Sequence, residues 1–441
     1  MQKYASRITA ISSCSLRSSL SFGQLLAIAV HYRATVEPLP PLFSKLQEIM
    51  GVILTPDNVA LFYWFKGTSL SRLGISSLEG DLASQTLIDF ISDMGTIYPN
   101  MKTFCNDSFL GEEHSDVMVR AVSKTITSWK HLVDVYLNSI DLDTAAYEHL
   151  MRLESLASLN LMLFYRSLPR LRQADLPQTP FPVLRDLTLV DCDNHIPWIV
   201  EWLDCLHLSP SILCCTTRVS SAEAQQVSSL CRAIATQLCH ESLETIILMN
   251  HGSSTSVEVD SIHPLFSFSR LRRVRIAHLC STSLSDEDLH QLAASWPLLQ
   301  VLHLNYYAEP QTVTPTLKGF CHLLQHCPDL QELTIVIDTR DSDWIDVARP
   351  VVCNPLMHYV GLGNSFLDDS KRVAAILFAI LPSVKEINTT CWSEDPLYYP
   401  PEGKPLWLLW KEVNRHLGEL WDRRDGDGAC LARFTRLSAQ R

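Results

Sequence analysis

Hydrophobic positions recur along the chain in one short phrase, apolar-x-x-apolar-x-apolar. A clear copy lies in "HCPDLQELTIVID", residues 326–338, where Leu330, Leu333 and Ile335 hold the apolar places. The last apolar places of each phrase alternate with polar ones, which is the period of a β-strand with one buried face. The phrase therefore predicts one strand at each of its copies.

Further copies of this phrase follow one another at intervals of about 28 residues, the period at which leucine-rich repeats are found. Strong copies begin at Leu70, Leu132, Leu156, Leu184, Leu243, Leu271, Leu299, Leu330 and Met357, and weaker copies begin at Leu46, Met101, Ile212 and Val384.

The intervals between the phrases are helical in pattern. Residues 222–238, 316–327 and 370–381 each place apolar side chains on one helical face. In the interval 283–296, Ser285 precedes two acidic residues, as a helix N-cap should. Strand, loop and helix units of this length stack into an α/β leucine-rich-repeat solenoid, with a curved parallel sheet on the concave side and helices on the convex side. The alternative, an ordinary α/β domain, would need a glycine-rich phosphate loop that the sequence lacks.

Composition narrows the partners and the compartment. The 441 residues are 46% hydrophobic and 19% charged, as in a folded chain, and the net charge of −12 disfavours nucleic acid. We expect no membrane partner, because no apolar run reaches the length of a membrane span. The 14 cysteines include no C-x-x-C pair, and no signal-peptide pattern precedes them. We therefore expect reduced cysteines and an intracellular protein, cytoplasmic or nuclear.

Searches for chemistry return no catalytic motif, so we expect no enzyme, no catalytic residue and no cofactor. The stretch "DCDNH", residues 191–195, groups Asp191, Cys192, Asp193 and His195. Cys192 holds the ninth place of a repeat, where Asn or Cys is common, so a structural role is favoured over a metal site. The acidic stretch "DTRDSDWID", residues 338–346, lacks the glycine and terminal glutamate of a calcium loop.

The stretches "PFPVLRDLTLVDCD", "HLLQHCPDLQELTIVID" and "CNPLMHYVGLGNS" carry a resemblance to one protein family. Over about residues 40–392, the chain resembles the leucine-rich-repeat region of F-box proteins, particularly the large fungal (basidiomycete) expansions. The resemblance implies a substrate-receptor role in a cullin ubiquitin ligase. The F-box that docks on a Skp-type adaptor is not found, so that adaptor is expected only if an F-box exists upstream.

The expected organisation has four parts. Residues 1–40 are an N-terminal segment, either a degenerate first repeat or a remnant after a missing F-box. Residues 41–392 form the solenoid of about 12–13 units. Residues 393–421 form a Trp-rich capping helix, for which a partner-binding helix is the alternative, and residues 422–441 form a polar tail.

The candidate site is the concave strip, made by residues that alternate with the buried apolar places. The residues expected to contact a protein partner are Arg273, Arg275, His303, Asn305, Glu332, Tyr136, Asn138 and Asn160. Arg273, Arg275 and His303 form a local basic spot suited to an acidic or phosphorylated segment. The alternative is a solvated strand face whose arginine is paired to a neighbour.

Two functions are compatible with these features. The first is a non-catalytic protein-recognition module, a substrate-receptor-type relative of F-box subunits. The second is a free-standing scaffold or inhibitor that binds a protein partner without ligase function.

Overall fold

The structure is a computed structural model of the whole chain. It describes residues 9–12, 45–56, 59–65, 69–78, 84–106, 116–138, 140–164, 176–191, 195–217, 223–250, 255–277, 280–304, 315–362, 365–388 and 406–426.

Thirteen of the described strands form one sheet, in the order β1-β2-β3-β4-β5-β6-β7-β8-β9-β11-β13-β14-β15, and every register resolved in it is parallel. These strands are β1 (Ala10–Ser12), β2 (Glu48–Leu54), β3 (Arg72–Leu78), β4 (Thr103–Asn106), β5 (Asp134–Leu137), β6 (Ser158–Leu163), β7 (Asp186–Asp191), β8 (Ile212–Thr217), β9 (Thr245–Asn250), β11 (Arg273–Ala277), β13 (Val301–His303), β14 (Glu332–Thr334) and β15 (Tyr359–Gly361). A separate parallel pair joins β10 (Thr255–Glu258) to β12 (Cys280–Ser283).

Helices connect most of these strands. The α-helices are α3 (Val59–Phe62), α4 (Gln85–Ile97), α5 (Asp116–Ser128), α6 (Thr144–Arg152), α8 (Ile196–Asp204), α9 (Ala224–Gln237), α10 (Asp286–Ser295), α11 (Leu317–His326), α12 (Ser370–Ile380) and α13 (Leu406–Gly426). The short 3-10 helices are η1 (Tyr63–Phe65), η2 (Val259–Ser261) and η3 (His263–Ser267). The predicted helices at 222–238, 283–296, 316–327 and 370–381 are confirmed, and Ser285 caps α10 by accepting a hydrogen bond from Asp288 N.

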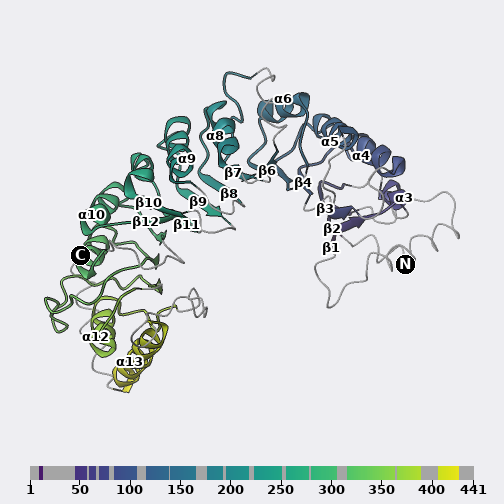
Figure 1. Ribbon diagram of the computed structural model, residues 1–441. Coiled ribbons are helices and arrows are strands. Elements are labelled where there is room, and N and C mark those ends of the chain that lie inside the picture. The colour runs from purple at the N-terminus through teal and green to yellow at the C-terminus, as the bar shows by residue number, and fades with distance from the viewer. Residues whose placement is uncertain are drawn as a thin grey trace. The chain divides into compact units, whose positions relative to one another are not determined.

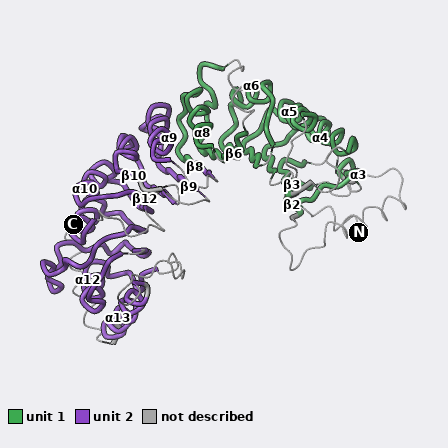
Figure 2. Tube along the Cα trace, viewed as in Figure 1, with its two compact units in different colours: residues 1–215 green, residues 216–441 purple. Residues whose placement is uncertain are grey.

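The chain divides into two compact units, residues 1–215 and residues 216–441 (Figure 2). Within each unit the helices lie along one face of the strands (Figure 1). The apolar places of the phrase are buried between strand and helix, as shown by Leu132 and Val135 in the first unit and by Leu330 and Leu333 in the second, all 0% exposed. The repeating strand, loop and helix, with parallel strands in sequence order, make the protein a leucine-rich-repeat solenoid of the α/β class.

Neighbouring repeats in the first unit are also joined by hydrogen bonds near the ends of their helices. The Tyr98 hydroxyl donates to Phe62 O at 2.5 Å, and the Trp129 indole N–H donates to Tyr98 O at 2.9 Å. Nε2 of His149 then lies 2.8 Å from Trp129 O. In the second unit, Trp296 makes the same bond to Leu265 O at 3.2 Å. Each bond gives a buried carbonyl a partner from the following repeat, which fixes the spacing of the repeats.

One predicted anchor is wrong in register. Ile212 is 37% exposed, while Leu213 and Cys215 are buried. The amides of Ser211 and Ile212 bond to Arg185 O in the way that the first residues of other strands bond to the preceding repeat. The phrase of β8 therefore begins at Pro210, where a buried proline replaces the usual leucine.

Within the described part of the second unit, two intervals are not α-helical. Residues 259–267 form η2 and η3, and residues 338–356 contain no helix. The second interval contains four aspartates together with Pro350 and Pro355. Aspartate favours turns and caps, and proline cannot be accommodated in a helix interior, so this composition disfavours a helix.

The C-terminal helix α13 packs against α12. Trp410 of α13 is fully buried, and its indole N–H donates to Ser365 O at 3.0 Å. The side-chain amide of Asn414 accepts a hydrogen bond from Ile387 N at 2.8 Å and donates one to Ile387 O at 2.9 Å. It thus pairs with this backbone as a neighbouring strand would. Among the described helices, none has the length and apolar content required to cross a membrane.

Candidate functional site

Residues that alternate with the buried anchors lie on the side of the sheet opposite the helices, here called the strand face. In the second unit the register aligns these residues in two rows across the strands. The first row contains Thr245, Arg273, Val301, Glu332 and Tyr359, and the second contains Ile247, Arg275, His303, Thr334 and Gly361.

Three basic side chains converge on the Glu332 carboxylate, and these four residues are here called the Glu332 cluster. Arg275 Nη2 lies 3.1 Å from Oε2, and His303 Nε2 lies 3.5 Å from the same oxygen. His358 Nε2 lies 3.9 Å from Oε1. The cluster therefore joins β11, β13, β14 and the start of β15.

His303 is the most buried member of the cluster, with 13% of its side chain exposed. Its ring stacks on Tyr359, with centroids 5.9 Å apart and planes at 23°. Burial is the main cause that lowers the pKa of His303 to about 4, with the Arg275 charge acting in the same direction and Glu332 opposing both. His303 is thus neutral at neutral pH. Any positive charge of the predicted basic spot at neutral pH therefore comes from its two arginines.

The two arginines differ in their surroundings. Arg275 is half-buried and paired with Glu332, as the alternative interpretation of the strip expected. Arg273, two residues earlier on the same strand, is exposed, and its guanidinium makes no hydrogen bond or ion pair with another described residue, while its backbone amide bonds Glu244 O at 3.1 Å. Arg273 is therefore the cation that this part of the strand face offers to a ligand.

The remaining predicted residues lie in the first unit or outside the described residues. Tyr136 and Asn160 are in register on β5 and β6, and the Tyr136 hydroxyl accepts a hydrogen bond from Ser158 at 3.2 Å. Oδ1 of Asn160 is buried without a hydrogen-bond partner among the described residues. Asn138 follows β5, and its amide bonds Asn106 O at 3.0 Å. Asn305 lies outside the described residues.

The first unit carries acidic groups on its strand face. Asp134 and Asp186 flank Ser158 in one register row. Burial, followed by repulsion from Asp134, raises the pKa of Asp186. Asp134 is stabilised by the Thr103 hydroxyl, which donates to Oδ2 at 2.9 Å. The strand face of this unit therefore differs in charge from the Arg273 region of the second unit.

Two members of the site were missed from the sequence. Tyr359 holds the third place of the phrase that begins at Met357, so the rule that found Glu332 also points to it. His358 precedes the strand, and only the three-dimensional structure brings its ring toward Glu332.

The described residues contain no group of three or more His, Cys, Asp or Glu side chains that could hold a metal ion. Within 191–195, Asp191 is fully buried and accepts a hydrogen bond from His195 N at 2.5 Å. Cys192 and Asp193 lie outside the described residues. Asp191 thus links the end of β7 to the residue that precedes α8.

No protein-family model and no curated protein sequence matches the chain. Among solved structures, it is similar to an internalin from Listeria monocytogenes, with 11% identity, a TM-score of 0.44 and coverage of 88% of this chain and 90% of that one. It is similar to a leucine-rich-repeat protein of Leptospira interrogans, with 13% identity, a TM-score of 0.41 and coverage of 82% and 88%. It is also similar to TLR13 in a complex with ssRNA13, with 12% identity, a TM-score of 0.43 and coverage of 86% and 51%. At these values the likeness carries no inference about function.

Proposed function

We propose that this protein is a non-catalytic recognition module that binds a protein partner on the strand face of its repeats. Parallel strands present side chains from successive repeats in aligned rows, and solenoids use such extended surfaces for protein partners. The observation that carries the proposal is Arg273. It is an exposed arginine without a described partner, placed beside the ordered Glu332 cluster.

The chemistry of this region favours an acidic or phosphorylated segment. Arginine binds carboxylate and phosphate groups through two parallel hydrogen bonds. Arg275, two residues away on the same strand, is paired with Glu332, which holds its guanidinium in place. Tyr359 adds an aromatic surface in the same row as Glu332. A partner carboxylate bound to Arg273 would therefore lie close to a second, pre-positioned guanidinium.

The finer proposal is a substrate receptor related to F-box subunits of cullin ligases, and it rests on the resemblance of the repeat phrases. The second candidate is a free-standing scaffold or inhibitor. The two differ in the fate of the partner: a substrate receptor shortens its lifetime through the proteasome, and a scaffold or inhibitor does not.

The experiment is affinity capture with the wild-type chain and with the Arg273→Glu/Arg275→Glu double variant, followed by mass spectrometry. The partner should be recovered with the wild type and lost with the double variant. Its half-life is then measured with and without the protein, and with a proteasome inhibitor. A partner half-life that is shortened by the protein and restored by the inhibitor supports the substrate receptor. An unchanged half-life supports the scaffold. Equal recovery by both proteins would contradict recognition through these arginines.

A further inference from the structure

The interval 338–356 leaves a gap in the layer of helices of the second unit. Elsewhere in this unit α10 packs against α11, and α12 packs against α13. The interval between β14 and β15 supplies no helix to follow α11. Among the described residues, the position that a helix would occupy beside α11 is therefore lined by irregular chain.

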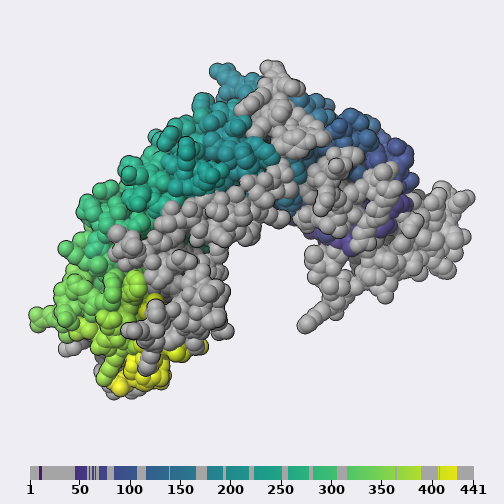
Figure 3. All heavy atoms as spheres, viewed as in Figure 1, coloured from purple at the N-terminus to yellow at the C-terminus, as the bar shows by residue number. Residues whose placement is uncertain are grey.

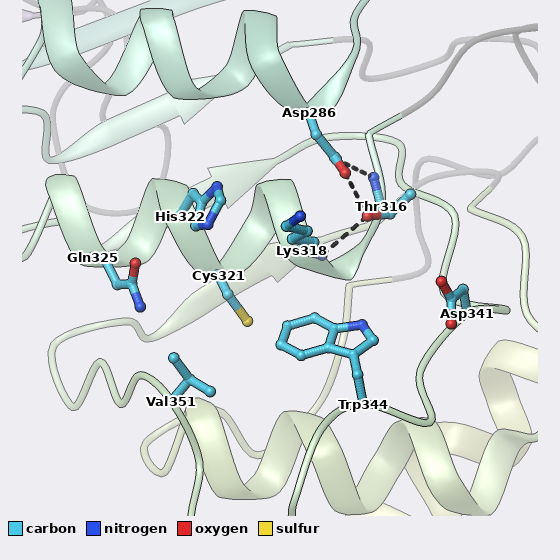
Figure 4. Close-up of a pocket in the computed structure, with 9 residues that line it drawn as sticks. All are labelled: Asp286, Thr316, Lys318, Cys321, His322, Gln325, Asp341, Trp344 and Val351. Carbon is cyan, nitrogen blue, oxygen red and sulfur yellow. Dashed lines mark hydrogen bonds between the residues drawn. The ribbon is translucent and has the colours of Figure 1, made fainter.

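A pocket of about 500 Å³ lies at this position, lined by Asp286, Thr316, Lys318, Cys321, His322, Gln325, Asp341, Trp344 and Val351. The lining residues of α11 are spaced i, i+3, i+4 and i+7, which is the stripe that a helix presents to a packed neighbour. Figure 4 shows Trp344 and Val351 opposite this stripe, and Asp341 beyond the indole. The pocket thus has a helix-packing face on one side and apolar side chains on the other.

Exposed apolar side chains are concentrated in the same interval. Trp344 is 42% exposed and Val351 is 62% exposed, and Val347 and Leu356 are also exposed. These residues lie within 13 positions of one another, in the light green part of the surface (Figure 3). Exposed apolar side chains that gather around a concave site mark an interaction surface.

The charged residues in and near the pocket determine which charge a ligand should carry. Asp286 is already used, because it accepts hydrogen bonds from Thr316 N and Oγ1, both at 2.7 Å, and from Gly319 N at 3.1 Å. Asp341 is exposed and has no hydrogen bond or ion pair with another described residue. Asp343 and Asp346 are exposed as well, although Asp343 is paired with Arg372 at 3.4 Å, and Arg340 is paired with Asp338. Lys318 of α11 is the basic residue in the lining. Asp341 is therefore the acidic group beside Trp344 that is available to a cation of a ligand.

We infer that this pocket binds an amphipathic helix of a partner protein, which takes the place of the missing repeat helix. The helix carries a large apolar side chain that packs against Trp344 and Val351, with a Lys or Arg one turn away that pairs with Asp341. Helix binding in a groove by such spaced anchors is a common recognition mode. This surface is separate from the strand face, and the inference does not depend on the proposed function.

The test uses two fluorescein-labelled 14-residue helical peptides and the full chain at about 0.15 M salt, where distant charges are screened. One peptide consists of Leu and Lys, and the other has Glu in place of every Lys. Fluorescence anisotropy should show binding of the Leu–Lys peptide and at least tenfold weaker binding of the Leu–Glu peptide. Trp344→Ala and Asp341→Lys should each weaken binding of the Leu–Lys peptide at least tenfold.

Matched variants separate this pocket from general attraction to an acidic protein. Val183→Ala changes a side chain that is 43% exposed in the first unit, and Glu154→Lys reverses an exposed charge there. Both, together with Arg273→Glu on the strand face, should bind the Leu–Lys peptide as the wild type does. If the circular dichroism signal shows that Trp344→Ala is unfolded, Val351→Ser replaces it in the test, because the Val351 side chain is more exposed. Val351→Ser should also weaken binding of the Leu–Lys peptide. Equal affinities for all variants, or for both peptides, would overturn the inference.

Discussion

The guanidinium of Arg275 lies 3.1 Å from the carboxylate of Glu332, although the two residues are 57 positions apart and β13 lies between their strands. The pair spans three repeats and fixes the rotamers of both side chains. It also lowers the net positive charge beside Arg273, so it affects the charge of the strand face more than its stability.

Replacing Glu332 with Gln should therefore change binding without unfolding the protein. Both side chains of the pair are partly exposed, and such pairs contribute about 0–1 kcal/mol. Urea unfolding should shift by no more than about 1 kcal/mol. The affinity for a Glu-rich fluorescent peptide should rise several-fold, because the carboxylate that competes for Arg275 is removed. Glu154→Gln in the first unit is the control, and an unchanged affinity in Glu332→Gln would show that Glu332 does not compete for anions.

His303 should make stability depend on pH. Its pKa in the folded protein is about 4, below the ordinary 6.5, so the unfolded chain binds more protons between these values. The free energy of unfolding should fall as pH drops from about 6.5 towards 4, by at most roughly 3 kcal/mol from this side chain. Urea unfolding of the wild type and His303→Gln across this range measures the difference. The variant should show the flatter dependence, and parallel curves would contradict the assignment.

The buried anchors should dominate stability. Leu333 is fully buried at the centre of β14, and Leu333→Ala should cost about 2–5 kcal/mol. Leu298→Ala changes a leucine that is 37% exposed, and it should cost less than about 1 kcal/mol. Urea unfolding followed by circular dichroism compares the two. Equal losses would mean that the phrase does not mark the core.

Two helical glycines should respond oppositely to alanine. A Cβ at Gly319 would lie 2.4 Å from Asp286 Oδ1 and 3.1 Å from Asp286 Cα, so α10 and α11 would have to separate. Gly319→Ala should destabilise the protein by about 1–3 kcal/mol. Gly418 in α13 has open space around it, and Gly418→Ala should stabilise by about 0.5–1 kcal/mol. Thermal unfolding of both variants tests the packing of the helix layer, and a stabilising Gly319→Ala would contradict it.

The repeat could be predicted from the sequence because its anchors are large aliphatic residues at fixed spacing. The prediction was wrong at Ile212, where a proline takes the place of the leucine and moves the register. The interval 338–356 departs from the helical pattern, and its aspartates and prolines were a signal of this. At both places the local residue types indicated the departure from the repeat, whereas the regular spacing alone predicted a standard unit.

The residues of the strand face could be predicted, but their pairing could not. Alternation along each strand places Arg275 and Glu332 on the same side. Whether the two side chains meet depends on the register of three strands and on the reach of an arginine, which no local pattern encodes. The low pKa of His303 likewise depends on burial under Tyr359 and on the neighbouring guanidinium.

The central claim is that Arg273 and Arg275 recognise the partner, and calorimetric titration of the captured partner into the Arg273→Glu/Arg275→Glu variant tests it most directly. Arg232→Glu, an exposed charge reversal on α9, is the matched control and should bind as the wild type does. The account predicts that the double variant loses at least about 2 kcal/mol of binding free energy, because reversal adds repulsion to the lost contacts. Urea unfolding of the double variant should change by about 0.5 kcal/mol or less. An unchanged affinity in a folded double variant would contradict the claim, and the arginines would then belong to a solvated strand face.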